Sequence, residues 1–177
     1  MKKKLIIFDL DRVLFNTGFL VNQIKDYKVG MRFSLSHAKK INPTSISSAQ
    51  LCFPEVISVL ENLQKKNWEL WLFSEGYQAG QEWKLKQADL ERFFPRSKRF
   101  IFFKKEPALI KFIPKVKKLE QIFIVDDKST VLKKAKGVIP GIKTVLMCRG
   151  PFWKTKVANF KSDYKIKDLT ELISKVI

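Results

Sequence analysis

The chain has 177 residues, of which 45% are hydrophobic and 12% aromatic, a composition that supports one packed core and excludes general disorder. Its 35 Lys and Arg against 17 Asp and Glu give a formal net charge of +18, which favours anionic partners. The lysines are spread along the whole chain, so a basic solvated surface is the simpler interpretation and nucleic-acid binding the alternative. No run of 18 apolar residues occurs, so we expect a cytoplasmic protein without a membrane span.

Apolar runs and amphipathic stretches alternate along the chain. The expected strands cover residues 4–10, 69–76, 99–103, 121–127 and 142–148. The expected helices cover residues 18–30, 54–68, 78–94, 107–119, 128–137 and 168–177. Pro114 is expected to bend or break the helix over 107–119, and the polar stretch 31–53 could be a loop, a short helix or a small insert.

Strands that are apolar throughout and alternate with amphipathic helices are typical of a parallel sheet that is covered on both faces. We therefore expect an α/β fold, a Rossmann-like three-layer sandwich with a mainly parallel sheet and helices on both faces. The long interval between the first strand and the helix over 54–68 predicts a small helical insert at about residues 16–53.

Oxygen-bearing side chains stand at the ends of three expected strands. Asp9 and Asp11 follow the first, Ser74 ends the second, and Asp126 and Asp127 end the strand over 121–127. Because the carboxyl ends of parallel strands meet at one edge of the sheet, these side chains are expected to converge there. Carboxylates gathered in this way repel one another unless a cation lies between them.

These segments resemble ordered motifs of the haloacid dehalogenase-like (HAD) superfamily. "FDLDRVLFNT" is similar to the first motif, "WLFSEG" to the second and "IFIVDDK" to the fourth, and "PGIKTVLMCRG" is similar to the strand that follows. The resemblance covers most of the chain and implies a single HAD-like core domain over 1–177, of the small-cap phosphatase type, with the insert as its cap.

The resemblance also implies roles for the acids. Asp9 would be the nucleophile that forms an aspartyl-phosphate, and Asp11 would protonate the leaving group and then activate water. Mg²⁺ would be the cofactor, held by Asp9, the backbone carbonyl of Asp11, Asp126 and Asp127.

The third motif supplies a lysine, and "KKEP" is similar to its K-P-x-P pattern. This places the catalytic lysine at Lys104, with Lys105, Lys111 and Lys115 as alternatives in a chain so rich in lysine.

Three further residues are expected at the substrate phosphate. They are Ser74, Glu75 and Arg12. Arg12 stands where many members of the superfamily have glycine, so it is a candidate for contacts specific to this chain. Phe152, Trp153 and Lys154, together with Tyr77, could stack a base, although packing in the core is the commoner role of aromatic residues.

The sequence thus predicts a Mg²⁺-dependent phosphomonoester hydrolase whose substrate is a phosphorylated small molecule, either an anionic metabolite or a nucleotide. The alternative is a catalytically weak or inactive basic module of the same fold that binds nucleic acid or a protein partner. The presence of both Asp9 and Asp11 disfavours that alternative. A metal-free dehalogenase is disfavoured as well, because its chemistry has little use for Asp11.

Overall fold

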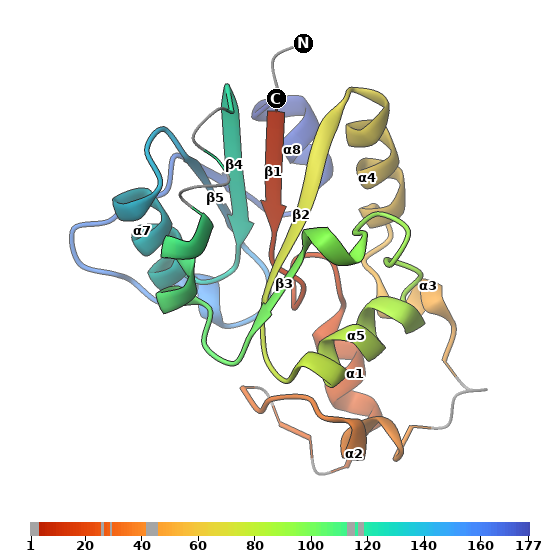
Figure 1. The fold of residues 1–177 in the computed structure, drawn as a ribbon. Coiled ribbons are helices and arrows are strands. Elements are labelled where there is room, and N and C mark those ends of the chain that lie inside the picture. The colour runs from red at the N-terminus through yellow and green to blue at the C-terminus, as the bar shows by residue number, and fades with distance from the viewer. Residues whose placement is uncertain (1–3, 26, 29, 42–45, 113–115, 117–118) are drawn as a thin grey trace.

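The computed structural model describes residues 4–25, 27–28, 30–41, 46–112, 116 and 119–177. These residues form one six-stranded sheet in which every pairing is parallel, with the strand order β3-β2-β1-β4-β5-β6 (Figure 1). The strands are β1 (Lys4–Phe8), β2 (Trp68–Glu75), β3 (Arg99–Phe102), β4 (Gln121–Asp126), β5 (Lys143–Met147) and β6 (Tyr164–Ile166). The expected Rossmann-like α/β class is confirmed.

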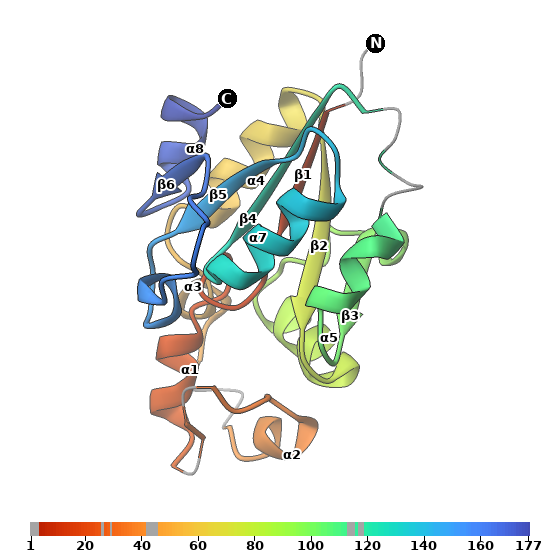
Figure 2. The ribbon, with the colours of Figure 1, turned by 90° about the vertical axis from the view of Figure 1, so that its left-hand side faces the viewer.

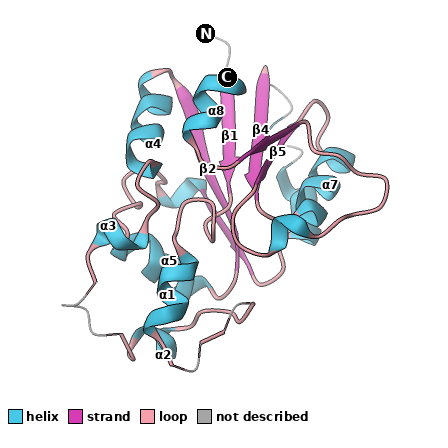
Figure 3. Ribbon diagram, turned by 180° about the vertical axis from the view of Figure 1, so that it is seen from behind, coloured by secondary structure: helices cyan, strands magenta, loops and turns pink. Residues whose placement is uncertain are grey.

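Helices cover both faces of the sheet because the central strands are apolar on both sides. In β1, Ile6 and Phe8 belong to one core, and Leu5 and Ile7 belong to the other. The first core is closed by α4 (Val56–Lys65), α5 (Gln78–Gln87) and α8 (Thr170–Lys175) (Figure 3). The second is closed by α7 (Ser129–Val138), in front of the sheet in Figure 2, and by the 3-10 helix η2 (Glu106–Phe112).

The segment between β1 and α4 lies below the carboxyl ends of the strands (Figure 1). Its described residues include three short helices, α1 (Thr17–Gln23), α2 (Leu35–Ala38) and α3 (Ser48–Leu51). Phe33 of this segment is buried in the first core and approaches α5 so closely that a Cβ on Gly80 would lie 2.2 Å from the Phe33 carbonyl oxygen. Glycine at position 80 therefore allows this segment to sit against the core at the edge where the site is expected.

The structure corrects some of the expected elements. β6 has three residues and was not expected, and α5 ends at Gln87, before the expected boundary at residue 94. In the helix expected over 107–119, the part up to Phe112 is the 3-10 helix η2 and Val116 is helical, while the expected bend at Pro114 lies outside the described residues. Among the helices of the described part of the chain, none combines the length and apolar character that crossing a membrane requires.

Candidate active site

Three carboxylates converge at the carboxyl ends of β1 and β4. The register pairs Phe8 with Val125, so Asp9 and Asp126 occupy the next positions along adjacent strands. Asp127 follows directly, and oxygens of Asp9, Asp126 and Asp127 all lie within 4.8 Å of one another. All three residues are at least 95% buried, with exposed fractions of 5%, 0% and 1%. The structure therefore brings these three acids together at the edge that the parallel arrangement predicts.

A buried lysine lies against two of these acids, and it is Lys105. Its Nζ is 2.7 Å from Oδ1 of Asp9 and 2.6 Å from Oδ2 of Asp126, and its side chain is 1% exposed. Burial lowers the pKa of Lys105, but the carboxylates of Asp126 and Asp9 outweigh burial and raise it above its usual value. Lys105 is therefore a charged counter-ion to the acid cluster.

This arrangement corrects the expected position of the lysine. The side chain of Lys104 is exposed, and Lys111 is exposed with its Nζ 5.3 Å from the ring centroid of Phe102. Lys115 lies outside the described residues. After β3 the chain turns so that the second lysine of "KKEP" faces the acids. The sequence alone does not show which of these two neighbouring lysines points toward the site.

One ammonium group does not balance three buried carboxylates. Burial, together with the charge of Asp126, raises the pKa of Asp9 to about 6 against the opposing effect of Lys105. Burial and the charges of Asp9 and Asp126 raise the pKa of Asp127 to about 8. Neither side-chain oxygen of Asp127 accepts a hydrogen bond from the described residues. Such a crowded set of hard oxygen donors fits a divalent cation such as Mg²⁺.

The side chain of Asp11 turns away from this cluster and accepts three hydrogen bonds. Lys84 Nζ and Thr17 Oγ1 each lie 2.6 Å from Oδ1 of Asp11, and Gln81 Nε2 lies 3.0 Å from Oδ2. Burial raises the pKa of Asp11, but the charge of Lys84 and these hydrogen bonds lower it to about 2. Asp11 is thus an ionised carboxylate here, and only its backbone carbonyl is left as a group that could join a cation.

Lys84 and Gln81 are site residues that the sequence analysis missed. They lie three positions apart on α5 and so face the same side of the helix. Gln81 Nε2 also donates to the Glu75 carbonyl at 2.8 Å. A Cβ on Gly76 would lie only 2.5 Å from this same Nε2 atom, so glycine at position 76 makes room for Gln81. The available signals in the sequence were the glycine directly after the second strand and the polar pair on the next helix. Because the chain has so many lysines, Lys84 did not stand out among them.

The two expected phosphate ligands at the end of β2 differ in their surroundings. Ser74 is fully buried, and its hydroxyl has no hydrogen-bond partner among the residues that the structure describes. Glu75 is engaged with cations, since its Oε1 lies 3.2 Å from Lys128 Nζ and 3.8 Å from Arg32 Nη2. Its carboxylate therefore holds two cations at the site, and we revise its expected role from phosphate ligand to partner of those cations.

Arg12 is fixed in an unusual conformation beside Asp127. Its φ angle of 65° lies in the left-handed region, which costs a residue other than glycine roughly 1–2 kcal/mol. The guanidinium lies 4.6 Å from the Phe152 ring centroid, and Nη1 is 3.9 Å from Oδ2 of Asp127. A Cβ on Gly150 would lie 2.5 Å from Cδ of Arg12, so glycine there makes room for the side chain.

The aromatic residues expected to stack a base do not form one surface. Phe152 lines the cavity at the acid cluster, with Arg12 and Lys128 near its ring. Trp153 and Lys154 line a different hollow, next to β5. Tyr77 lines a third hollow, described below.

The cavity at the acid cluster measures about 80 Å³, which is room for a few water molecules. Asp9, Asp11 and Asp127 line it, and it is bordered by five cationic side chains: Arg12, Arg32, Lys84, Lys105 and Lys128. A small, cation-rich cavity with buried carboxylates at its base has the size and charge to receive one phosphoryl group.

The sequence matches no family model and no curated protein. The fold, however, is that of the haloacid dehalogenase-like hydrolases, as solved structures show over nearly the whole chain. A protein of Burkholderia xenovorans LB400, assigned as a haloacid dehalogenase-like hydrolase, matches with a TM-score of 0.74 and 13% identity, covering 99% of this chain and 97% of that one.

Two further solved structures agree. YfnB of Bacillus subtilis, assigned as a HAD-hydrolase and solved bound to magnesium, has a TM-score of 0.69 at 14% identity, with 98% of each chain covered. A HAD phosphatase of Thermococcus onnurineus has a TM-score of 0.64 at 20% identity, with 97% of this chain and 96% of that chain covered. At these identities the likeness establishes the fold, and the chemistry has to be argued from the side chains of this chain.

Proposed function

We propose that the protein is a HAD-like phosphatase that hydrolyses phosphate monoesters, with Asp9 as the nucleophile. One observation carries the proposal: Asp9 lies at a cavity of phosphoryl size, 2.7 Å from the buried Lys105 and beside Asp126 and Asp127. A binding module has no need to bury three carboxylates and a lysine together, because burying charged groups is costly.

Asp9, Asp126 and Asp127 are the residues that would hold Mg²⁺, with the backbone carbonyl of Asp11 as a further ligand. A bound Mg²⁺ supplies positive charge between the carboxylates and the phosphate dianion. The magnesium bound in the structurally similar YfnB supports this assignment.

The proposed reaction has two steps. In the first, an oxygen of Asp9 forms a bond to phosphorus, the ester P–O bond breaks, and the alcohol leaves after its oxygen takes up a proton. In the second, water attacks phosphorus, which releases inorganic phosphate and restores the Asp9 carboxylate. Lys105 would offset the charge of Asp9 in both steps, and Arg12, which lines the cavity, would contact the phosphoryl oxygens. Ser74, buried at the end of β2 with a free hydroxyl among the described residues, stays a proposed phosphate ligand.

Asp11 and Lys84 together handle the proton in this proposal. Asp11 accepts hydrogen bonds from Lys84 Nζ and Thr17 Oγ1, each at 2.6 Å. The pair supplies the proton to the leaving oxygen and recovers one from the attacking water, so the cycle is balanced.

The experiment is a phosphatase assay with p-nitrophenyl phosphate, with Mg²⁺ and after chelation, on the wild type, Asp9→Asn and Asp89→Asn. We expect activity that requires Mg²⁺, a loss of at least about 10³-fold in Asp9→Asn and little change in Asp89→Asn. Asp89 is an exposed acid paired with Arg92, and asparagine tolerates its left-handed backbone, so it is a matched control. Metal-independent activity, or full activity of Asp9→Asn, would contradict the proposal.

The second candidate is a basic module that binds nucleic acid or a protein partner, and the net charge of +18 is the observation that favours it. It gains support if no phosphate ester is turned over and the protein binds nucleic acid with an affinity that falls steeply with salt.

A further inference from the structure

The catalytic cavity is small and opens toward its surroundings. Its volume of about 80 Å³ has room for a phosphoryl group, and the esterified part of a bulky substrate would extend beyond it. A second hollow of about 500 Å³ adjoins it and shares three lining residues with it, Gly30, Met31 and Arg32. We call this hollow the mouth groove; it is lined by Gly30, Met31, Arg32, Ser34, His37 and Tyr77.

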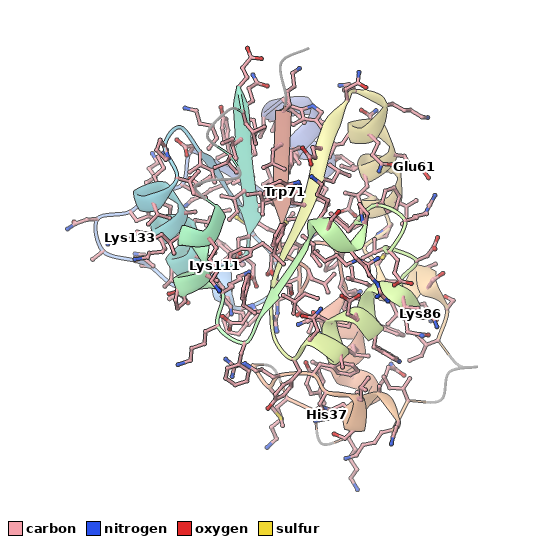
Figure 4. The ribbon with its side chains drawn as sticks, viewed as in Figure 1. His37, Glu61, Trp71, Lys86, Lys111 and Lys133 are labelled. Carbon is pink, nitrogen blue, oxygen red and sulfur yellow. The ribbon has the colours of Figure 1, made fainter. Side chains whose placement is uncertain are left out.

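The mouth groove joins the core to the segment between β1 and α4. Tyr77 lies two residues after the end of β2, and Phe103 comes directly after β3. The Gly76 N–H donates to the Phe102 carbonyl at 2.9 Å, which keeps these two strand ends adjacent, and the Tyr77 and Phe103 ring centroids are 5.6 Å apart. His37 belongs to α2, at the lower edge of Figure 4.

Exposed apolar side chains gather at this place. Among the described residues, five large apolar side chains are exposed: Met31, Leu35, Tyr77, Phe103 and Ile110. Met31 and Tyr77 line the mouth groove, and Phe103 packs against Tyr77. An apolar cluster beside a polar site commonly marks a ligand-binding surface.

Arg32 adds a positive charge where the groove meets the catalytic cavity. Its guanidinium carbon lies 4.0 Å from the Phe103 ring centroid, and Nε and Nη2 donate to the Phe103 carbonyl at 3.3 and 3.2 Å. The side chain is therefore held in place before any ligand binds, which reduces the entropy lost on binding.

The lining of the groove suits the stacking of a flat group. Tyr77 offers an aromatic ring that is 49% exposed, and Met31 a polarisable thioether, both suited to stacking. Ser34 and His37 line the same hollow and are hydrogen-bonded to each other, with Ser34 Oγ 2.9 Å from His37 Nδ1. A sugar alone would leave the exposed aromatic ring without a stacking partner.

We infer that the mouth groove binds the nucleoside part of a nucleotide whose phosphate occupies the catalytic cavity, with the base stacked on Tyr77. The inference rests on the proposed phosphatase function and narrows its substrate class. Arg32 lies at the junction, where it contacts the sugar-phosphate part.

The test compares adenosine 5′-monophosphate with ribose 5-phosphate, which has the same phosphorylated pentose but lacks the base. We expect a higher kcat/KM for the nucleotide in the wild type. Tyr77→Ala should lower kcat/KM for the nucleotide by roughly 5- to 150-fold and leave that for ribose 5-phosphate unchanged. Tyr77→Phe should retain the preference, and Ile110→Ala, which removes an exposed apolar side chain outside the groove, should behave as the wild type.

Equal or better use of ribose 5-phosphate by the wild type would overturn the inference, as would an equal loss for both substrates in Tyr77→Ala. If Tyr77→Ala does not fold, Met31→Ala, which changes another residue of the groove lining, is assayed on the same two substrates in its place. A 5′-phosphorylated oligonucleotide in the same assay distinguishes a nucleic-acid end from a free nucleotide. Preference for either over ribose 5-phosphate, lost in Tyr77→Ala, supports the inference.

Binding to Asp9→Asn, measured by calorimetry, separates this inference from the proposed function. If p-nitrophenyl phosphate is hydrolysed but the nucleotide binds no more tightly than ribose 5-phosphate, the inference fails and the proposed function stands. If no ester is hydrolysed and the nucleotide still binds through Tyr77, the proposed function fails and the groove assignment stands.

Discussion

Lys105 stands between two carboxylates that would otherwise repel each other. Its Nζ is within 2.7 Å of both Asp9 and Asp126, and the side chain is almost completely buried. A lysine is stable in such a position only because both partners are charged, since an isolated buried ammonium would lose its proton. The same contacts keep Asp9 oriented in the cavity.

Replacing this lysine should therefore impair the reaction strongly. We expect Lys105→Met, which keeps the length of the side chain, to lower kcat for p-nitrophenyl phosphate by roughly 10²–10³-fold. Lys104→Met removes the same charge from an adjacent, exposed position and is expected to stay within about twofold of the wild type. Steady-state assays of the two variants, with circular dichroism to check folding, decide between them. A greater loss of kcat in Lys104→Met than in Lys105→Met would contradict the assignment of Lys105 to the site.

Among individual residues, those at strand ends were predictable and those brought in by other segments were not. Asp9, Asp126 and Asp127 each follow an apolar run, and parallel pairing brings such positions to one edge. Choosing between Lys104 and Lys105 depends on how the chain turns after β3, which has no sequence pattern. Lys84 is recognisable only once α5 is known to pack beneath Asp11.

At the scale of elements, one side chain connects the far edge of the sheet to a helix. Asp163, just before β6, accepts hydrogen bonds from the Thr144 N–H at 2.8 Å and the Thr144 hydroxyl at 2.7 Å in β5. Lys136 of α7 donates to the same carboxylate at 2.6 Å. Burial raises the pKa of Asp163, but the hydrogen bonds from Lys136 and Thr144 lower it to about 2. The carboxylate thus contributes to the attachment of β6.

This lowered pKa predicts a pH-dependent stability. The contribution of Asp163 is fully present above its unfolded pKa of about 4 and is lost as pH falls through the folded pKa of about 2. At pH 7 we expect Asp163→Asn to lower the free energy of unfolding by about 1–2 kcal/mol. Roughly half of this difference should be gone at pH 3. Urea titrations at both pH values measure it.

Lys136→Met is the comparison for that prediction, because it removes the ion pair and keeps both hydrogen bonds from Thr144. It should have a smaller effect than Asp163→Asn. A difference between the wild type and Asp163→Asn that is as large at pH 3 as at pH 7 would show that the charge of Asp163 is not what stabilises this edge.

The long apolar strands were predictable, whereas the elements that depend on their neighbours were not. The strand ending "FIVDD" is buried on both faces and has an unambiguous pattern. β6 has only three residues and is defined by its pairing with Val145–Met147 of β5, so no local pattern marks it. Pro107 stands near the start of a stretch whose apolar spacing suggested an α-helix, and over Glu106–Phe112 the observed helix is the tighter 3-10 form.

At the scale of the whole molecule, the high net charge comes mainly from lysines that lie outside the cavity at the acid cluster. Several exposed lysines lie away from the strand ends, such as Lys133 of α7 in Figure 4. The cations that border the catalytic cavity are few and each has a partner, such as Asp11 for Lys84. The overall charge of +18 thus favours the approach of anions, while the proposed reaction would depend on the buried groups at one end of the sheet.

The central claim is that phosphate is transferred to Asp9, and trapping this intermediate tests it most directly. The enzyme is mixed with substrate and Mg²⁺, quenched with acid within one turnover, and digested for mass spectrometry. We predict one phosphoryl group on the peptide that contains Asp9, removed by hydroxylamine as expected for an acyl phosphate and missing in Asp9→Asn. Rapid Mg²⁺-dependent hydrolysis by an enzyme in which Asp9 is never phosphorylated, or full activity of Asp9→Asn, would contradict the claim.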